Sequence, residues 1–233
     1  GTAVLGLGDI GAAASKPVME GKGLLFKVFA DIDVFDIEIN EKDPKKFIEI
    51  VKSISTTFGG INLEDIKAPE CFEIEEVLKK ELDIPVMHDD QHGTAIITGA
   101  ALINALEIAN KDISKIKVVV NGAGASAQAC TKMYISLGVN PKNIYMFDSK
   151  GILNNKRKDL NKYKSHFINN TNISTLKEAL DGADLFLGLS KAGTLNPEYI
   201  RNMNDNPIIF ALSNPVPEII PEDAKKIRKD IIM

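Results

Sequence analysis

Apolar residues recur along the chain with two periods that alternate from one segment to the next. Residues spaced three or four apart, such as Phe47, Val51 and Ile54, predict amphipathic helices. Short unbroken apolar runs, such as the three valines at 118–120, predict buried strands. Because strands that alternate with helices are typical of parallel α/β sheets, we expect an α/β fold.

The same two patterns predict most elements of the chain. Strands are expected at 2–5, from about 34 to 40, and at 61–63, 84–87, 115–120, 143–148, 184–190 and 206–212. Helices are expected at 12–19, from 24 to about 33, and at 44–58, 70–82, 94–109, 125–137, 173–183 and 197–203. The polar, basic segment 149–171 is predicted to be a solvated loop with one short helix.

Composition limits the class of protein more than its function. The chain has 233 residues, 44% of them hydrophobic and 26% charged, with a net charge of -4, which is ordinary for a soluble globular protein without a nucleic-acid footprint. No apolar stretch is expected to span a membrane. Cys71 and Cys130 form no CxxC pair, which favours a reduced, cytoplasmic protein. The chain opens inside a strand-like segment and closes in an apolar run, so we expect a fragment cut at both ends.

A glycine-rich turn follows the valine strand and opens a helix. Its residues are Gly122, Ala123, Gly124, Ala125, Ser126 and Ala127. Glycines here allow a tight turn and close approach to a pyrophosphate, whose charge the helix N-terminus stabilises. Asp148 ends the next strand, where an acid binds a ribose hydroxyl. We therefore favour dinucleotide binding over a purely structural turn.

The choice between NAD and NADP stays open. Asp148 favours NAD, because a carboxylate repels a 2′-phosphate. Lys150 and the basic run 156–158 could offset this repulsion, although we interpret that run as a solvated loop. A second glycine-rich turn at 6–11 has no acid at the matching distance, and we interpret it as a structural turn.

Two pairs of acids, Glu64-Asp65 and Asp89-Asp90, each follow a predicted strand. Ligands of open α/β sheets bind beyond the carboxyl ends of strands. Four carboxylates there would repel one another unless a divalent cation lay between them, and oxygen ligands suit Mg²⁺ or Mn²⁺. The alternative, that these acids cap helices, is equally compatible with the pattern.

Two isolated residues are candidates only in that context. Lys22 in PVMEGKG is an ordinary surface lysine unless burial near a metal lowers its pKa and makes it a base. Asn214 ends the last strand in SNPVPEI, where its amide could contact a nicotinamide or a carboxylate substrate. A turn asparagine before proline is the alternative.

Taken together, seven motifs resemble those of the malic enzyme family, most closely its shorter bacterial-type members. They are GLGDIG, PVMEGK, the strand-end ED, HDDQHGTA, NGAGASA, FDSKG and SNPVPEI, in the family's order. The resemblance implies oxidative decarboxylation of malate to pyruvate and CO₂ with reduction of NAD or NADP, and a homodimer. It implies that Lys22 is the general base and that Asp89 orients it. It further implies that Glu64, Asp65 and Asp90 bind the metal, that 123–126 hold the pyrophosphate, and that Asn214 contacts nicotinamide or substrate.

The resemblance also implies a domain division. Residues 1–90 would be a partial α/β malate- and metal-binding domain, and 91–233 a Rossmann-type NAD(P)-binding domain with a parallel sheet. The family's general-acid tyrosine lies in a Tyr-Thr-Pro-Gly-type segment upstream of GLGDIG, and none of the tyrosines at 134, 145, 163 and 199 matches it. An Asn-rich segment of the family's substrate pocket is also missing.

Three hypotheses follow. The first is a metal- and NAD(P)-dependent malic enzyme, and the second is a catalytically silent dinucleotide-binding fragment without the general acid. The third, an enzyme similar to amino-acid dehydrogenases, is disfavoured because hydride transfer alone needs no strand-end pairs of acids.

Overall fold

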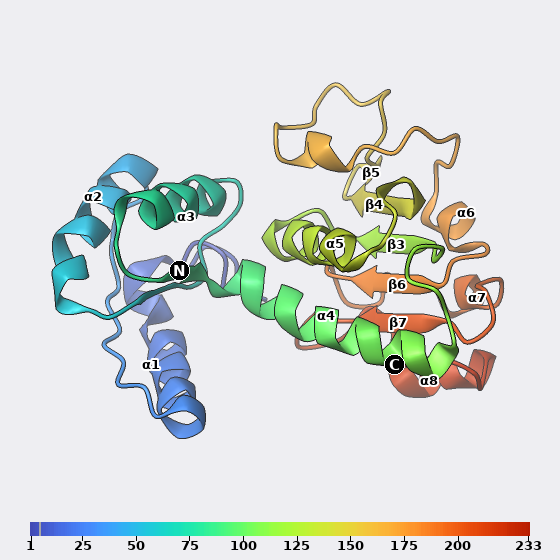
Figure 1. Ribbon diagram of the computed structural model, residues 1–233, viewed down its shortest axis with the longest axis horizontal. Coiled ribbons are helices and arrows are strands. Elements are labelled where there is room, and N and C mark those ends of the chain that lie inside the picture. The colour runs from blue at the N-terminus through green and yellow to red at the C-terminus, as the bar shows by residue number, and fades with distance from the viewer. Residues whose placement is uncertain (5) are drawn as a thin grey trace. The chain divides into compact units, whose positions relative to one another are not determined.

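The computed structural model describes residues 1–4 and 6–233, which form two compact units, Gly1–Asp90 and Gln91–Met233 (Figure 1). The second unit has a five-stranded sheet in the order β5-β4-β3-β6-β7. Its strands are β3 (Val118–Asn121), β4 (Ile144–Asp148), β5 (Gly151–Ile152), β6 (Leu185–Gly188) and β7 (Ile208–Ala211). Every pair is parallel except β4 with β5. The predicted Rossmann-type α/β fold is confirmed.

The strand order reverses at β3. From β3 the chain moves outward to β4 and β5, and then returns to the other side of β3 to form β6. In open parallel sheets, such a reversal leaves a crevice at the carboxyl ends of the two central strands, where ligands bind. The crevice of this unit is therefore expected beyond the ends of β3 and β6.

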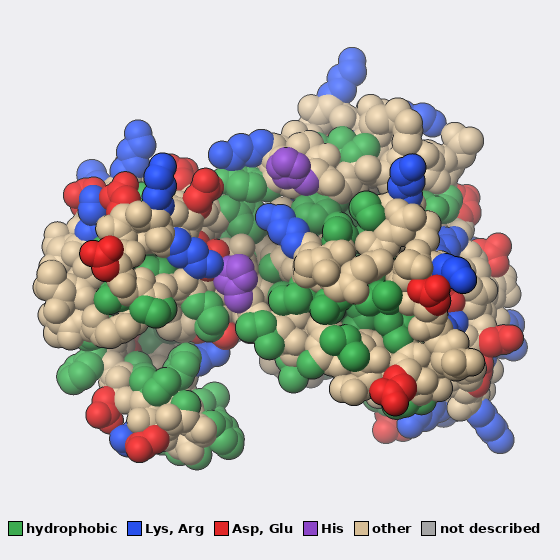
Figure 2. Space-filling view, viewed as in Figure 1, with side chains coloured by type: hydrophobic (Ala, Val, Ile, Leu, Met, Phe, Trp, Pro, Cys, Tyr) green, Lys and Arg blue, Asp and Glu red, His purple; other side chains and the backbone are tan. Residues whose placement is uncertain are grey.

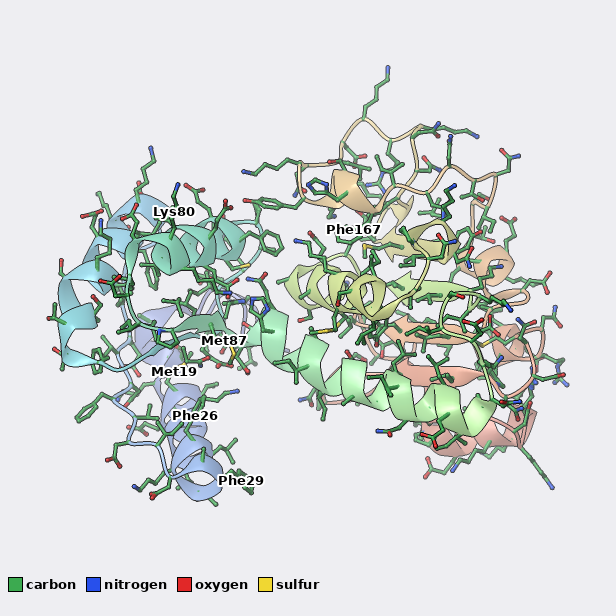
Figure 3. The ribbon with its side chains drawn as sticks, viewed as in Figure 1. Met19, Phe26, Phe29, Lys80, Met87 and Phe167 are labelled. Atoms are coloured by element: carbon green, nitrogen blue, oxygen red, sulfur yellow. The ribbon has the colours of Figure 1, made fainter. Side chains whose placement is uncertain are left out.

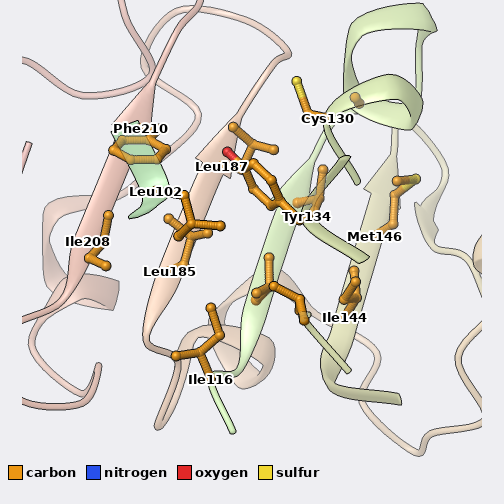
Figure 4. Packing of buried hydrophobic residues seen from close by; sticks show 14 of the residues in the cluster. Leu102, Ile116, Cys130, Tyr134, Ile144, Met146, Leu185, Leu187, Ile208 and Phe210 are labelled. Atoms are coloured by element: carbon orange, nitrogen blue, oxygen red, sulfur yellow. The ribbon is translucent and has the colours of Figure 1, made fainter. Parts of the chain in front are cut away.

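Helices cover both faces of this sheet. One face packs against α4 (Asp89–Ala109) and α5 (Ala125–Leu137), in a core that includes Leu102, Tyr134 and Met146 (Figure 4). The other face packs against α6 (Leu176–Leu180), α7 (Pro197–Ile200) and α8 (Pro221–Ile227). Because both faces are covered, all three valines of β3 are fully buried.

Helix α4 is long and apolar enough to cross a membrane by length and composition alone. Core helices of soluble proteins meet the same criterion, and Ala95, Leu102 and Leu106 of α4 belong to the sheet core.

The first unit is smaller. Strands β1 (Ile61–Leu63) and β2 (Val86–His88) pair in parallel, and α2 (Pro44–Ile54) and α3 (Glu70–Glu81) pack with them around a small core. Its buried members are Ile48, Val51, Leu63, Ile74, Leu78 and Val86. Asp43 caps α2 through hydrogen bonds from the N–H groups of Lys45 and Lys46. A short 3₁₀ helix follows α2 at Ser55–Thr57, and the second unit has others at Pro141–Asn143 and Lys164–Phe167.

Helix α1 (Gly11–Ala30) joins the two helices predicted at 12–19 and from 24 to about 33 into one, and of its residues only Ser15 is buried. Apolar side chains gather on its surface (Figure 2), including Leu24, Val28 and Phe29, of which Phe29 is 83% exposed. Little of α1 therefore belongs to a buried core.

The predicted strand at 34–40 is wrong. Residues 31–43 have no regular structure, although their apolar and acidic residues alternate as in a strand. Asp36 and Glu38 instead form ion pairs with Lys16 of α1, so the alternation serves contacts to a helix. The predicted strand at 2–5 is also wrong for the described residues, where Val4 makes only an isolated bridge with Gly8, and Leu5 lies outside them.

Candidate active site

Three carboxylates converge where β1 and β2 end. Glu64 and Asp65 follow β1, and Asp90 lies in the first turn of α4, directly after β2. Leu63 is in register with His88, so the two carboxyl ends meet at one edge of the sheet. One oxygen from each of Glu64, Asp65 and Asp90, the carboxylate cluster, lies within 4.8 Å of the others. Side chains from distant parts of the sequence thus form one group of oxygen ligands.

The backbone of Asp65 directs its side chain into the cluster. Asp65 has φ 54°, in the left-handed region that only Gly, Asn and Asp adopt readily. Its N–H donates to Oδ2 of Asp90 at 3.0 Å. Its carbonyl accepts from the N–H groups of Thr2 and Ala3 at 2.9 and 3.0 Å. The segment before GLGDIG therefore holds Asp65 in place.

The cluster suits a divalent cation. Oδ2 of Asp65 is buried and has no hydrogen-bond partner among residues 1–4 and 6–233. Burial of an unpaired carboxylate oxygen is unfavourable, and a cation would supply the missing partner. A site made only of oxygen ligands fits Mg²⁺ or Mn²⁺. The metal roles of Glu64, Asp65 and Asp90 stay predictions.

The three acids bind protons more tightly than free carboxyls do. Burial raises the pKa of Glu64 to about 7, against a hydrogen bond from Asn62 and the charge of Lys22. Burial and the charge of Asp90 raise the pKa of Asp65 to about 6. The pKa of Asp90 is raised mainly by burial. The ionised cluster is therefore unfavourable until a cation compensates it.

We expect the free energy of unfolding of the chelator-treated protein to fall between pH 5 and pH 8. The ordinary pKa values of Glu64 and Asp65 are 4.5 and 3.8, so the folded state binds more protons than the unfolded state across this range. Stability is then greatest at the acidic end and declines as pH rises through about 7. Urea unfolding at the two pH values measures the decline, and saturating Mn²⁺ should abolish it. An unchanged free energy from pH 5 to 8 without Mn²⁺ would contradict the expectation.

Lys22 and Asp89 form a pair beside the cluster. Nζ of Lys22 donates to Oδ2 of Asp89 at 2.8 Å and lies 3.3 Å from Oε1 of Glu64. Burial opposes the charge of Lys22, but the hydrogen bond to Asp89 and the charges of Glu64 and Asp89 outweigh it, and the pKa of Lys22 is raised. The protein groups alone therefore keep Lys22 charged, and the prediction that burial near a metal lowers its pKa stays a prediction.

His88 lies behind the cluster. It is fully buried at the end of β2, and its Nε2 lies 3.3 Å from Oδ2 of Asp90. Its N–H donates to Oε1 of Glu75 at 2.9 Å, and Glu75 pairs with Lys79. His88 thus contacts Asp90 from the buried side of the cluster.

A cavity of about 550 Å³ in the first unit reaches Lys22 and Glu64. Most of its lining is apolar, with Met19 and Phe26 on α1 and Met87 on β2 (Figure 3). A small molecule therefore has space beside the Lys22–Asp89 pair.

In the second unit, the turn at 122–127 places the N-terminus of α5 at the carboxyl end of β3. Gly122 has φ 132°, and a Cβ there would lie 2.4 Å from the carbonyl oxygen of Leu189. Only glycine therefore fits at position 122, because the loop after β6 passes too close for a side chain. A Cβ on Gly124, the residue before α5, would meet nothing within 4 Å. The helix N-terminus, with Ala125 and Ser126 in its first turn, is therefore open to a phosphate.

The rest of this turn is fixed from inside. Ala127 is 1% exposed in the core, and Nε2 of Gln128 donates to the carbonyl of Ala123 at 3.1 Å. A small residue at position 127 is typical of close helix–strand packing, and the burial of Ala127 agrees with this.

Asp148 lies at the end of β4, surrounded by cations. Its carboxylate accepts from Arg157 at 2.9 and 3.1 Å and from Lys164 at 2.7 Å. Burial opposes its charge, but these hydrogen bonds outweigh the burial and hold the pKa at about 2. Arg157 is only 14% exposed and also bonds Asp159. The interpretation of 156–158 as a solvated loop is therefore wrong for Arg157.

Asn214 is exposed in the loop after β7, joined to Pro215 by a cis peptide bond. Sequence reasoning missed four polar residues of the second unit, which lie at or after the ends of β3, β6 and β7: Asn121, Ser190, Thr194 and Glu218. The strand-end rule that selected the acids could have selected the first three. Glu218 carries no such signal.

Comparisons with known proteins agree with this arrangement. A family model described as "Malic enzyme, NAD binding domain" matches residues 91–232, and one described as "Malic enzyme, N-terminal domain" matches 1–46 and 40–79. The chain is 56% identical over 234 residues to the probable NADP-dependent malic enzyme of Rickettsia prowazekii. It is 52% identical over 233 residues to the NADP-dependent malic enzyme of Halomonas elongata.

Solved structures give the same result. The crystal structure of the NAD-dependent malic enzyme from Thermotoga maritima superposes with a TM-score of 0.92 at 51% identity, covering 97% of this chain and 61% of that one. Both curated relatives cover all of this chain, which spans 30% and 55% of their lengths. The resemblance carried by the seven motifs is thereby confirmed, and the chain belongs to the malic enzyme family.

Proposed function

We propose that this chain carries the metal and cofactor residues of an enzyme that oxidatively decarboxylates malate to pyruvate and CO₂ with reduction of NAD or NADP. The observation that carries the proposal is the carboxylate cluster beside the Lys22–Asp89 pair. The cluster gathers three carboxylates at one point, with Asp65 buried, and places a lysine between Glu64 and Asp89. Together they suit a hydroxy acid that must lose a proton next to a cation.

In this proposal Glu64, Asp65 and Asp90 hold Mg²⁺ or Mn²⁺. When bound, the cation would make the malate hydroxyl more acidic and draw electron density from the C2 oxygen. Lys22 takes the hydroxyl proton at Nζ. For that it must first be neutral, and the charges of Glu64 and Asp89 oppose this. Commitment of the Glu64 carboxylate to a cation would remove one of these two effects.

Asp89 has a separate role in the proposal. Its hydrogen bond of 2.8 Å to Nζ fixes the direction of the lysine and stabilises the ammonium after proton transfer. Asp89 is therefore an orienting partner of Lys22 rather than a member of the carboxylate cluster.

The second unit would bind the dinucleotide, whose nicotinamide accepts the hydride. The turn at 122–127 would hold the pyrophosphate, and the amide of Asn214 would contact the nicotinamide or the substrate. Asp148 and Asp159 face three cations, Lys150, Arg157 and Lys164. Because this group carries one surplus positive charge, we propose that it accepts NADP as well as NAD.

The catalytically silent alternative also has support. Residues 1–90 contain no tyrosine, and the four tyrosines lie in the second unit. Tyr134 is fully buried in the sheet core, and burial raises its pKa. Tyr134 is therefore enclosed in the core of its own unit, and residues 1–90, which carry the carboxylate cluster, supply no tyrosine themselves.

Two measurements on the 233-residue chain separate the alternatives. The enzyme hypothesis predicts malate-dependent formation of NAD(P)H that Mn²⁺ stimulates and a chelator stops. Calorimetry with NAD, NADP and Mn²⁺ plus malate gives the binding of each. Nucleotide binding without malate-linked metal binding would support the silent module and overturn the enzyme hypothesis for this chain. The homodimer and the cytoplasmic location stay predictions.

A further inference from the structure

Glu218 is a completely buried carboxylate in the loop after β7. Its Oε1 accepts from the N–H of Ser190 at 2.9 Å, and its Oε2 accepts from the N–H of Ser213 at 3.0 Å. Across the described part of the chain, residues 1–4 and 6–233, it forms no ion pair. Burial of a carboxylate without a cation is expensive, so these backbone donors must stabilise it.

The contacts of Glu218 join two loops. Ser190 belongs to the loop after β6 and Ser213 to the loop after β7, and the backbone repeats this link. The N–H of Leu195 donates to the carbonyl of Glu218, and that of Gly193 to the carbonyl of Pro217, both at 3.2 Å. The two loops are thus tied together by side chain and main chain.

The end of β6 leaves room for this carboxylate only because Gly188 has no side chain. A Cβ on Gly188 would lie 2.5 Å from Cδ of Glu218. The fit fixes the carboxylate against the strand, so its position is determined by packing as well as by hydrogen bonds.

From Ser190 the hydrogen bonds continue to the end of β3. Nδ2 of Asn121 donates to Oγ of Ser190 at 2.9 Å and to Oγ1 of Thr194 at 3.0 Å, and the two hydroxyls are 3.1 Å apart. Ser190 and Thr194 are exposed, unlike Glu218. The three side chains, Asn121, Ser190 and Thr194, form a polar triad beyond the ends of β3 and β6, where the strand order reverses.

We propose that Glu218 is a positioning residue for the nicotinamide half of the dinucleotide, a proposal that rests on the proposed cofactor binding. The pyrophosphate turn follows β3, and Asp148 places the adenosine half toward β4. The other half then extends over β6 and β7, whose loops carry Ser190, Thr194 and Asn214. Glu218 holds both loops at the correct spacing without touching the cofactor.

The test is Glu218→Gln in the full 233-residue chain, with binding measured by calorimetry for NAD, NADP and ADP. Glutamine keeps the size but turns an NH₂ group toward one of the two N–H donors, so one link is lost. We expect NAD and NADP to bind about tenfold more weakly, because the unpaired buried donor disfavours the arrangement of the two loops that receives the nicotinamide half. Binding of ADP, which lacks the nicotinamide half, should change less than about twofold.

Asp184→Asn is the matched control. Asp184 is a buried acid directly before β6, at the amino ends of the strands. It accepts hydrogen bonds from the N–H of Lys117 and from Nζ of Lys111. The Asp184→Asn substitution should lower the melting temperature without changing the ratio of dinucleotide to ADP affinity. An equal loss of dinucleotide and ADP binding in Glu218→Gln, or no loss, would overturn the proposal.

Two further results keep the outcomes distinct. If Glu218→Gln does not fold, Ser190→Ala takes its place, since it removes an exposed hydroxyl of the triad and should weaken dinucleotide binding alone. Failure of the unsubstituted chain to bind any dinucleotide would overturn the cofactor part of the proposed function, and the role of Glu218 with it. If the unsubstituted chain binds dinucleotides but Glu218→Gln, or Ser190→Ala in its place, leaves the affinity ratio unchanged, only the role of Glu218 is overturned.

Discussion

Replacement of Lys22 with alanine is expected to lower malate-dependent NAD(P)H formation by about 10²- to 10⁴-fold, the usual contribution of a general base. Mn²⁺ should bind at least as tightly as before. Nζ of Lys22 lies 3.3 Å from Oε1 of Glu64, so its removal leaves the carboxylate cluster more negative. Initial rates with saturating malate, together with Mn²⁺ titration by calorimetry, measure both effects.

Lys27→Ala is the control for this experiment. Lys27 lies on the same helix, α1, and forms ion pairs with the exposed Asp31 and Asp33. It should leave the rate within about twofold, because exposed ion pairs contribute little. Equal rates for the Lys22 variant and the unsubstituted chain would remove Lys22 from its proposed role, whatever the Mn²⁺ affinity.

Asp65→Asn is expected to have two large effects of opposite sign. At pH 8 without a divalent cation, the variant should be more stable by on the order of 2 kcal/mol, because it removes a buried charge whose pKa is raised to about 6. Its affinity for Mn²⁺ should fall by about a hundredfold or more, because a ligand oxygen is lost. Urea unfolding with a chelator and Mn²⁺ titration measure the two effects.

Asp31→Asn is the control for the left-handed backbone, since it tests whether an Asp-to-Asn change at this conformation alone alters stability or Mn²⁺ affinity. Asp31 and Asp65 share φ 54°, but Asp31 is exposed at the end of α1. Its substitution should change neither stability nor Mn²⁺ affinity appreciably. A destabilised Asp65 variant that still binds Mn²⁺ tightly would show that Asp65 is a structural residue and not a metal ligand.

The sequence predicted elements best where local pattern and tertiary environment agree. Strand β3 and the helices at 44–54 and 70–81 were predicted to within a few residues, because a buried apolar run and an amphipathic stripe each have one favourable structure. The segment 34–40 alternates like a strand, but the sheet of its unit contains only β1 and β2 within the described residues. Alternation cannot tell whether a partner strand exists.

The candidate site shows a similar division. The positions of Glu64, Asp65 and Asp90 followed from the rule that parallel strands end at one edge, which needs only the strand ends. The pKa of Lys22 did not, because its direction depends on how close Glu64 and Asp89 lie. Glu218 was missed for a similar reason, since its partner Ser190 lies 28 residues away in another loop. The burial of Arg157 was not predicted, because it depends on how the loop brings its partners Asp148 and Asp159 together.

Helix α1 has a consequence for how the site could be controlled. It carries the proposed base, Lys22, yet buries only Ser15 and presents Leu24, Val28 and Phe29 to solvent. An element with so few buried contacts can be displaced at a small free-energy cost. A partner that packed on α1 would then help to set how much of the time Lys22 lies beside Asp89, and with it the activity of the proposed base.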